Sequence, residues 1–148
     1  MTDTNAQAAP QAVPQAAPQV LGGLTPYLQL DGALKAAAFY GKAFGAEQVF
    51  AYPPDEKGRT MHVHLHVNGS SLMLSDAFPE HGHPHRPVQG CTMQLHLKNG
   101  NIERWWQRAV DAGCEVAVPL DVMFWGDRWG LLRDPFGVEW GMNAPVKG

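Results

Sequence analysis

Apolar and polar residues alternate along several short segments, and two longer segments have the composition of helices. Successive residues of a strand point to opposite faces of a sheet, so alternation indicates a half-buried strand. The pattern predicts strands at 25–30, 47–52, 59–67, 72–76, 91–97 and 115–120, a hairpin at 127–142, and helices at 32–46 and 101–114. Asn101 is a possible cap of the second helix, and Gly113 ends it. Turns are predicted at Asn68-Gly69 and at 134–137.

The order of these elements repeats, each time as βαβββ. Thr25, Leu28 and Leu30 align with Thr92, Leu95 and Leu97. With a one-residue insertion, Gly45 aligns with Gly113, Gly69 with Gly137, and Met73 with Gly141. Each repeat is too small to bury its sheet alone. We therefore predict an α+β fold in which two βαβββ modules form a curved mixed sheet with a concave cleft.

Length and composition limit the domain organisation. The chain has 148 residues, 45% of them hydrophobic and 17% charged, which is typical of one globular domain. Residues 1–21 consist mostly of Ala, Pro and Gln and are interpreted as a disordered tail. Residues 22–146 are predicted to form a single domain, with module 1 at 22–80, a linker at 81–89 and module 2 at 90–146.

Charge and cysteine content argue against several partners and compartments. A net charge of -3 gives no reason to expect nucleic acid or an anionic membrane surface as a partner. Two cysteines, Cys91 and Cys114, are more simply interpreted as free thiols in a reducing compartment. No segment is long and apolar enough to span a membrane. A cytoplasmic location is the expectation, and the open sheet edges favour a homodimer.

The segments "PYLQLDGALKAAAFYGKAFGAE", "LMLSD" and "PLDVMFWGDRWGLLRDPFGVEW" resemble the vicinal oxygen chelate superfamily, which includes glyoxalase I, extradiol dioxygenases and bleomycin-resistance proteins. Within that superfamily the resemblance is to the PhnB-like branch and covers about residues 22–146. It implies a glyoxalase-like fold and a homodimer. In metal-binding members, ligands lie on the first and last strand of each module. The corresponding positions here are Thr25, Met73, Thr92 and Gly141.

None of these four residues is a usual ligand of a catalytic divalent metal. We therefore predict that the usual metal site is absent and that no cofactor is bound. The alternative is a metal-dependent lyase, isomerase or dioxygenase of the same superfamily, in which His62 and His64 replace the missing ligands.

Three histidines at alternate positions, His62, His64 and His66, should share the concave face, with Val63, Leu65 and Val67 on the helix side. The sequence leaves open whether they contact a ligand, bind a metal or form a solvated or dimer-facing surface. A second group in the linker, His81, His83 and His85, is interpreted as a polar connection that could also capture metal.

The most specific part of the resemblance is "FWGDRWG", residues 124–130. Its Trp and Arg side chains can provide apolar walls and an anion-binding donor. Asp127 can either hold Arg128 in an ion pair or leave it free. In the alternative interpretation, Trp125 and Trp129 only pack the sheet. The predicted ligand-binding residues are Tyr27, Gln29, Gln94, Trp125, Asp127 and Arg128.

Two functions remain in competition. One is a binding protein that holds a small organic ligand, with an anionic group as one option, in the cleft without the usual metal. The other is an enzyme of the glyoxalase superfamily with His62 or His64 as general base, since histidine titrates near neutrality. The sequence does not identify the ligand, and it favours the binding protein slightly because aromatic residues are abundant.

Overall fold

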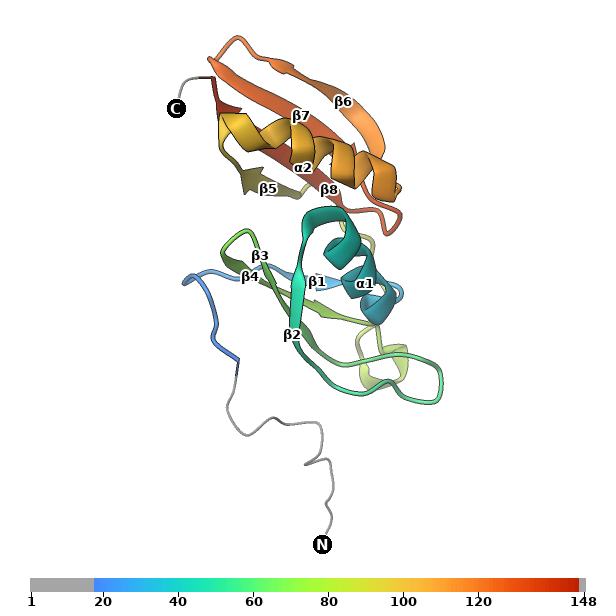
Figure 1. Cartoon of the computed structure of the whole chain (residues 1–148). Coiled ribbons are helices and arrows are strands. Elements are labelled where there is room, and N and C mark those ends of the chain that lie inside the picture. Colours follow the sequence, from blue (N-terminus) through green and yellow to red (C-terminus); the bar gives the residue numbers. More distant parts are fainter. Residues whose placement is uncertain (1–17, 147–148) are drawn as a thin grey trace, which may run out of the picture. The chain divides into compact units, whose positions relative to one another are not determined.

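The computed structural model describes residues 18–146 of the chain. They divide into two compact units, the first comprising residues 18–38 and 46–86 and the second residues 39–45 and 87–146. Most of the predicted tail, residues 1–17, lies outside the described residues. Each unit contains one four-stranded mixed sheet, labelled in Figure 1. The predicted fold class, α+β with two βαβββ modules, is confirmed.

The first unit follows the predicted element order. It consists of β1 (Tyr27–Gln29), α1 (Ala33–Phe44), β2 (Glu47–Ala51), β3 (Val63–Val67) and β4 (Ser70–Ser75). The strands lie in the order β1-β4-β3-β2, with β1 parallel to β4 and the other pairs antiparallel. The turn between β3 and β4 has positive φ at Asn68 (48°) and at Gly69 (78°), the conformation that Asn-Gly pairs favour. The hairpin is where the sequence predicted it.

A buried carboxylate positions the first helix. Asp76 follows β4 and is only 5% exposed. One of its oxygens accepts hydrogen bonds from the backbone N–H groups of Gly32 (2.8 Å) and Ala33 (3.1 Å), and the other accepts one from Thr60 (2.9 Å). The first N–H groups of a helix have no partner within the helix, so a carboxylate here stabilises its start. Asp76 therefore has a structural role.

The second unit contains the second repeat and the end of α1. Its elements are β5 (Thr92–His96), α2 (Asn99–Ala112), β6 (Glu115–Val122), β7 (Asp127–Arg133) and β8 (Glu139–Pro145). The strand order is β5-β8-β7-β6, which corresponds to the first sheet. Figure 1 shows α2 lying across one face of this sheet. On that face, the ring of Trp106 approaches Gly130 so closely that a Cβ atom would collide with it.

The predicted cap of α2 is wrong, although the predicted end is right. The helix begins at Asn99 after the extended residue Lys98, which makes no side-chain capping hydrogen bond. Asn101 therefore lies within the first turn and is not the cap. The helix ends before Gly113, which has a φ of 126° and donates its N–H to the carbonyls of Ala109 and Val110. A left-handed residue after the last turn is the usual reason for glycine there.

The end of α1 contributes the aromatic core of the second unit. The rings of Phe44 and Trp140 stack with centroids 4.2 Å apart, and Tyr40 lies 5.0 Å from Trp140. Asp134, which is 4% exposed, accepts hydrogen bonds from the Tyr40 hydroxyl (2.6 Å) and the Trp140 indole (3.0 Å). Burial first, and then the charge of Asp134, raise the pKa of Tyr40, which keeps its hydroxyl a donor. This carboxylate is also structural.

The register of the sheets confirms the internal repeat. Tyr27 lies opposite Met73 in the parallel pair of the first sheet, and Gln94 lies opposite Gly141 in the parallel pair of the second. In the sequence alignment, Tyr27 corresponds to Gln94 and Met73 corresponds to Gly141. Corresponding positions in the two units can therefore be compared directly.

Candidate functional site

One face of the first sheet is apolar and the other carries polar groups. Val63, Leu65 and Val67 are buried, as predicted for the side toward the helix. Because paired residues share a face, the register places His64 and His66 opposite Met73 and Ser71 on the other side, together with Tyr27 and Gln29. We call this side the open face of the first sheet. Its polar side chains supply the first candidate site.

Tyr27 and His62 form a hydrogen-bonded pair at the edge of this face. The Tyr27 hydroxyl lies 2.6 Å from Nδ1 of His62. Burial lowers the pKa of His62 and raises that of Tyr27. Both shifts favour the neutral side chains, and a neutral imidazole either accepts the phenol proton at Nδ1 or donates from that atom, depending on its tautomer. The structure thus brings these two predicted site residues within hydrogen-bond distance of each other.

His64 has a different environment. Its side chain is 3% exposed, and Nε2 lies 2.7 Å from the Ser71 hydroxyl, which also accepts the backbone N–H of Leu21 at 2.8 Å. Burial and then the neighbouring His66 and His62 lower the pKa of His64. A general base must reach its substrate, and this imidazole is covered. The interpretation of His64 as a catalytic residue is therefore not supported by its position.

Residues 19–21, from the predicted tail, contribute to this face. The carbonyl oxygen of Gln19 lies 2.7 Å from Nε2 of His66, and the carbonyl of Leu21 accepts the backbone N–H of Ser71 at 3.1 Å. These contacts use backbone atoms, so the Ala/Pro/Gln-rich composition gave no signal of them. Ser71 was also missed, and its position opposite His66 in the hairpin was the available signal.

A pocket of about 380 Å³ lies beside Tyr27. Gln29 extends into its wall, and the Gln29 side-chain oxygen accepts the backbone N–H of Arg86 at 2.9 Å. The rest of the wall comes from Met61 before β3, from the end of β4 and from the segment after it, which includes the short 3₁₀ helix Pro79–His81. The lining residues are Tyr27, Gln29, Met61, Ser75, Asp76, Phe78, His81 and His83. Two of the linker histidines therefore face the same pocket as the predicted binding residues.

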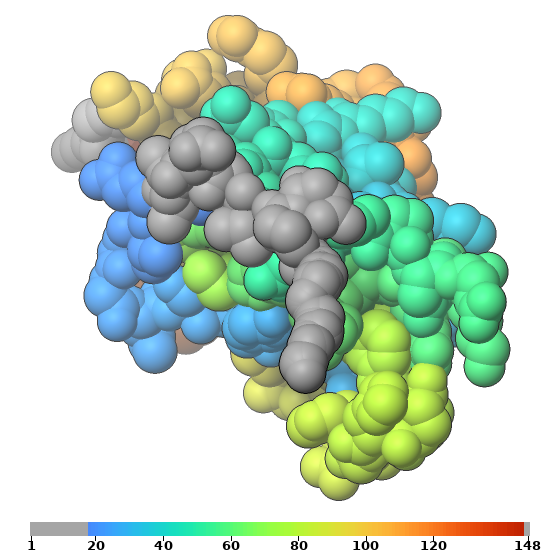
Figure 2. All heavy atoms as spheres, turned by 90° about the horizontal axis from the view of Figure 1, so that it is seen from below, coloured from blue at the N-terminus to red at the C-terminus, as the bar shows by residue number. Residues whose placement is uncertain are grey.

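An ion-pair network holds the loops around this pocket together. The Arg59 guanidinium lies over the Phe78 ring at 4.5 Å and pairs with Glu80 at 2.6 Å and with Asp55 at 3.0 Å. Hydrogen bonding to Arg59 lowers the pKa of Glu80 to about 2. Figure 2 shows the green loop between β2 and β3 beside the yellow-green segment after β4. Arg59 joins the two segments that border the pocket.

The second sheet has a corresponding open face. Gln94, Trp129 and Asn143 share it, since Gln94 pairs with Gly141 and Trp129 with Asn143. The Trp129 indole N–H donates to the side-chain oxygen of Gln94 at 3.2 Å, directly above Gly141. A Cβ atom at position 141 would overlap that oxygen, so only glycine leaves room for the bond in this geometry. Trp125 contacts Trp129 edge to face at 6.1 Å and is 49% exposed.

Asp127 and Arg128 lie on opposite faces of this sheet. Asp127 accepts a hydrogen bond from the Asn143 amide at 3.1 Å on the open face. Arg128 points toward α2, where its guanidinium lies 3.4 Å from both Glu103 and Asn99. Of the two alternatives for Asp127 and Arg128, the ion pair is not formed, because neighbouring residues of a strand project in opposite directions. The interpretation of Arg128 as an anion holder in the ligand site is therefore corrected.

The residues at the superfamily's metal positions do not fit a divalent metal. Gly141 has no donor atom, and the space above it is filled by the Gln94 amide. Met73 offers only a thioether, which hard divalent cations bind poorly. Across residues 18–146, no group of three or more His, Cys, Asp or Glu side chains gathers in a metal-binding arrangement. We derive no chemical step through a metal.

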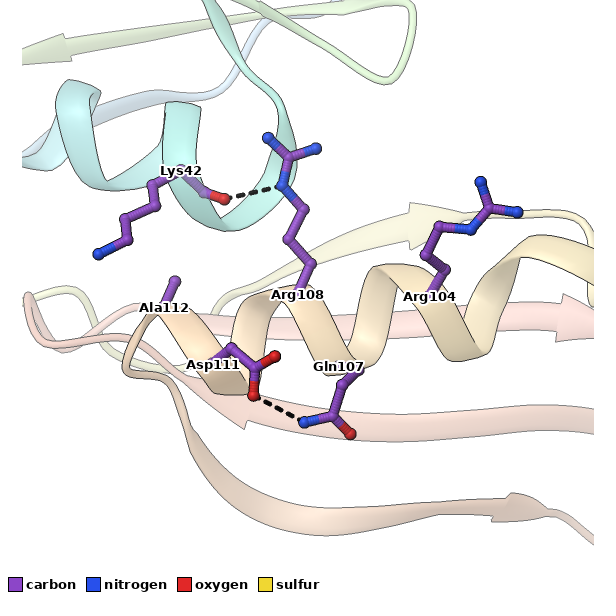
Figure 3. Close-up of a pocket in the computed structure, with 6 residues that line it drawn as sticks. All are labelled: Lys42, Arg104, Gln107, Arg108, Asp111 and Ala112. Carbon is purple, nitrogen blue, oxygen red and sulfur yellow. Dashed lines mark hydrogen bonds between the residues drawn. The ribbon is translucent and has the colours of Figure 1, made fainter.

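A hollow between the end of α1 and α2 in the second unit, about 410 Å³ in volume, has a structural explanation. Figure 3 shows Arg108 of α2 reaching the end of α1, where its Nε donates to the carbonyl of Lys42 at 2.8 Å. A second guanidinium nitrogen donates to the Gly41 carbonyl at 3.0 Å. The last carbonyls of a helix have no partner within it, so a cation there completes the helix end. Arg108 is a capping residue of this kind.

The family model for the glyoxalase/bleomycin resistance protein/dioxygenase superfamily matches residues 28–142. The chain belongs to this superfamily. A curated relative, an uncharacterised protein of Mycobacterium bovis, is 37% identical over 129 residues, which are 84% of each chain. The matched region of the superfamily model contains both sheets and both helices.

Solved structures of superfamily type have the same fold. Protein PA1353 from Pseudomonas aeruginosa is 29% identical, with a TM-score of 0.65 over 82% of this chain and 96% of that one. A PhnB protein from Bacillus cereus is 21% identical, with a TM-score of 0.64 over 83% and 99%. The glyoxalase-like fold predicted from the sequence is confirmed by these likenesses. Among the described residues, neither helix is long and apolar enough to cross a membrane.

Proposed function

We propose that the protein binds a small organic ligand in the pocket on the open face of the first sheet. The observation that carries this proposal is the 2.6 Å hydrogen bond between His62 and Tyr27, which is a wall residue of a 380 Å³ pocket. Small-molecule sites combine an apolar wall with a few placed polar groups. Here Met61 and Phe78 supply apolar surface, and Tyr27 and Gln29 supply the polar groups.

The pair also defines what chemistry the site can support. In the tautomer in which His62 Nδ1 accepts the Tyr27 proton, the phenol oxygen can take a proton from a ligand hydroxyl as it gives up its own. A proton accepted there passes on to His62, so the pair can act as a general base. Binding requires only the contact between the ligand and the Tyr27 hydroxyl. Catalysis would also require the transfer of the proton to His62. The binding role is therefore the primary proposal, with His62 as the base of any reaction.

The proposed ligand site works without the superfamily's divalent metal, in agreement with the poor donor set at positions 25, 73, 92 and 141. Protein purified without an affinity tag should contain no stoichiometric zinc, iron, nickel or manganese. Chelator should leave the melting temperature unchanged, because an ion that binds only the folded state would raise it. One metal per chain, lost in His62→Ala, would instead support the metal-dependent lyase, isomerase or dioxygenase.

The ligand proposal is tested by a metabolite screen with thermal shift, followed by isothermal titration of each hit. Tyr27→Phe removes the hydroxyl that reaches His62 and should weaken binding about 2- to 12-fold, the equivalent of one lost hydrogen bond. Tyr52→Phe is the matched control, since Tyr52 belongs to the same aromatic group but does not line the pocket. Equal affinities of the two variants would contradict the proposed site.

We also propose that the protein is a homodimer. Strand β6 is an edge strand that exposes the apolar side chains of Val116 and Val122. Exposed edges and apolar side chains of this kind are usually covered in solution. Light scattering at micromolar concentration should give twice the chain mass, and Val122→Asp should shift the mass toward the monomer. A monomeric wild-type protein would refute this proposal.

A further inference from the structure

The open face of the second sheet carries negative charge beside exposed aromatic rings. Asp127 lies on this face beside Asn143, and Asp121, paired with Trp129 in the register, lies on the same side. Strands β5 to β8 contain only two Lys or Arg residues, Arg128 and Arg133. The first points to α2. The second pairs with Glu139 at 2.8 Å, roughly 13 Å along the strand from Trp129. The charge around the tryptophans is therefore negative.

The aromatic rings beside these carboxylates are arranged to leave ring faces exposed. Trp125 meets Trp129 at an interplanar angle of 62°, and Phe124 meets Trp125 at 86°. An edge-to-face contact covers one face of only one of the two rings, and Phe124 and Trp125 are 97% and 49% exposed, so ring surface stays open to another planar group. The face of an indole ring is electron-rich and attracts cations, with Trp the strongest of the aromatic side chains. Both the rings and the carboxylates favour a positively charged ligand.

Gln94 adds a fixed donor group. The indole nitrogen of Trp129 can only donate, so the atom of Gln94 that faces it is the oxygen. The amide nitrogen of Gln94 then points away from Trp129, and both of its N–H groups remain without a partner among the described residues. Gly141 makes this orientation possible by leaving the space beneath the amide empty. The amide can therefore donate to an acceptor on a ligand held against the rings.

We propose that the open face of the second sheet binds a planar aromatic cation, such as an N-alkylated heteroaromatic ring. The ring stacks on Trp125, the positive charge faces Asp127 and Asp121, and an acceptor on the ligand takes the Gln94 amide. This inference rests on the proposed small-molecule function but concerns a different surface and a defined ligand charge. It reverses the anionic preference that Arg128 suggested in the sequence.

The test compares three probes of similar shape: N-methylquinolinium as the cation, N-methyl-2-quinolone as the neutral molecule and quinoline-2-carboxylate as the anion. Binding is followed on the indole N–H signals of the ¹⁵N-labelled full chain, with Trp125→Phe and Trp129→Phe assigning two of the five signals. The cation should shift these two signals and bind at least tenfold more tightly than the anion. Its affinity should fall as salt concentration rises.

Two variants and two controls locate the charge effect. Asp127→Asn and Asp121→Asn keep the size of the side chain and should each reduce the cation-to-anion ratio to threefold or less. Arg128→Gln changes a charge on the opposite face, and Glu56→Gln removes a charge from an exposed loop of the first unit. Both controls should leave the ratio within twofold of the wild-type value.

Three results would overturn the proposal: an anion that binds as tightly as the cation, an unchanged ratio in both Asp variants, or absence of any shift at Trp125 and Trp129. The last result would mean that the face is covered, for example by a second copy of the chain. Tyr27→Phe serves as a further control, because it removes the proposed ligand contact on the first sheet. If Tyr27→Phe leaves metabolite binding unchanged while the cation still binds the second sheet, the first proposal alone is refuted.

Discussion

The two sheets have the same strand order, but the polar groups on their open faces make different contacts. On the first sheet, His64 and His66 bind Ser71 and the backbone of residue 19, so their nitrogens are engaged within the protein. On the second sheet, Trp129 and Gln94 bind each other and remain partly exposed. The first face is closed over its histidines and leaves a pocket only at one edge, whereas the second presents rings and amides to solvent.

This difference shows how one sheet pattern serves two purposes. Glycine at position 141 and methionine at position 73 occupy equivalent places, and they determine what can lie above the strand. At Gly141 a neighbouring amide fills the space, while at Met73 the side chain fills it itself. A repeat can thus keep its register and change its surface through single residues.

The largest expected effect is on stability. His64→Ala should lower the free energy of unfolding by about 1–3 kcal/mol, because it removes a buried hydrogen bond and leaves the Ser71 hydroxyl without its partner. Gln94→Ala, at an exposed position of the second face, should change it by less than about 0.5 kcal/mol. Urea unfolding measures both. Equal losses of free energy in His64→Ala and Gln94→Ala would show that the two faces do not differ in this way.

The pH dependence of stability should come from the histidines of the first sheet. Burial lowers the folded-state pKa of His64 and His62 below the unfolded value of about 6.5. The unfolded chain then binds more protons in this window, so stability is full above about pH 6.5 and falls as pH drops toward the folded-state pKa. Melting temperatures from pH 5 to 8 should show this slope, shallower in His64→Gln. Trp129→Phe should keep the wild-type slope.

A smaller effect is expected from Gly141→Ala. The new methyl group must displace the Gln94 amide, which can move because it is the end of a flexible side chain. We expect a loss of less than about 1 kcal/mol, together with a change in the Trp129 indole signal as its acceptor is lost. An unchanged indole signal would show that Gln94 and Trp129 do not interact in solution.

The smallest effect is expected from deletion of residues 1–20. The deletion removes the Gln19 carbonyl that accepts from His66 but keeps Leu21, whose backbone binds Ser71. The free energy of unfolding should fall by less than about 1 kcal/mol, since a single partly exposed hydrogen bond is lost. A larger fall would show that the segment contributes more to the first face than these contacts explain.

Strand alternation allowed much of the fold and part of the site to be predicted. The buried side of β3 and the turn at Asn68-Gly69 follow from local patterns. The face of the sheet on which the Arg128 side chain lies was harder to predict from the sequence. Leu131 and Leu132 are both apolar, so they do not show which side of β7 is buried. The decisive fact is that Trp106 lies over Gly130 on the helix side.

Other features could not be predicted because they depend on backbone atoms or distant partners. The contacts of Gln19 and Leu21 use main-chain groups that any sequence possesses. The covering of His64 depends on these contacts and on Ser71, not on the histidine spacing. Helix α2 starts two residues before Asn101, and no capping side chain marks that start.

Helix α1 begins in the first repeat, but its last residues complete the core of the second. Tyr40 and Phe44 are joined to Trp140 and Asp134, close to the end of the chain. A gene cut in the linker would therefore separate Tyr40 and Phe44 from Trp140, and the second half would lack part of its hydrophobic core. On the ribosome, Tyr40 and Phe44 must wait until Trp140 has been synthesised. The aromatic core shared by the two repeats therefore forms late. A nascent chain stalled before Trp140 would expose apolar surface of the kind that chaperones bind.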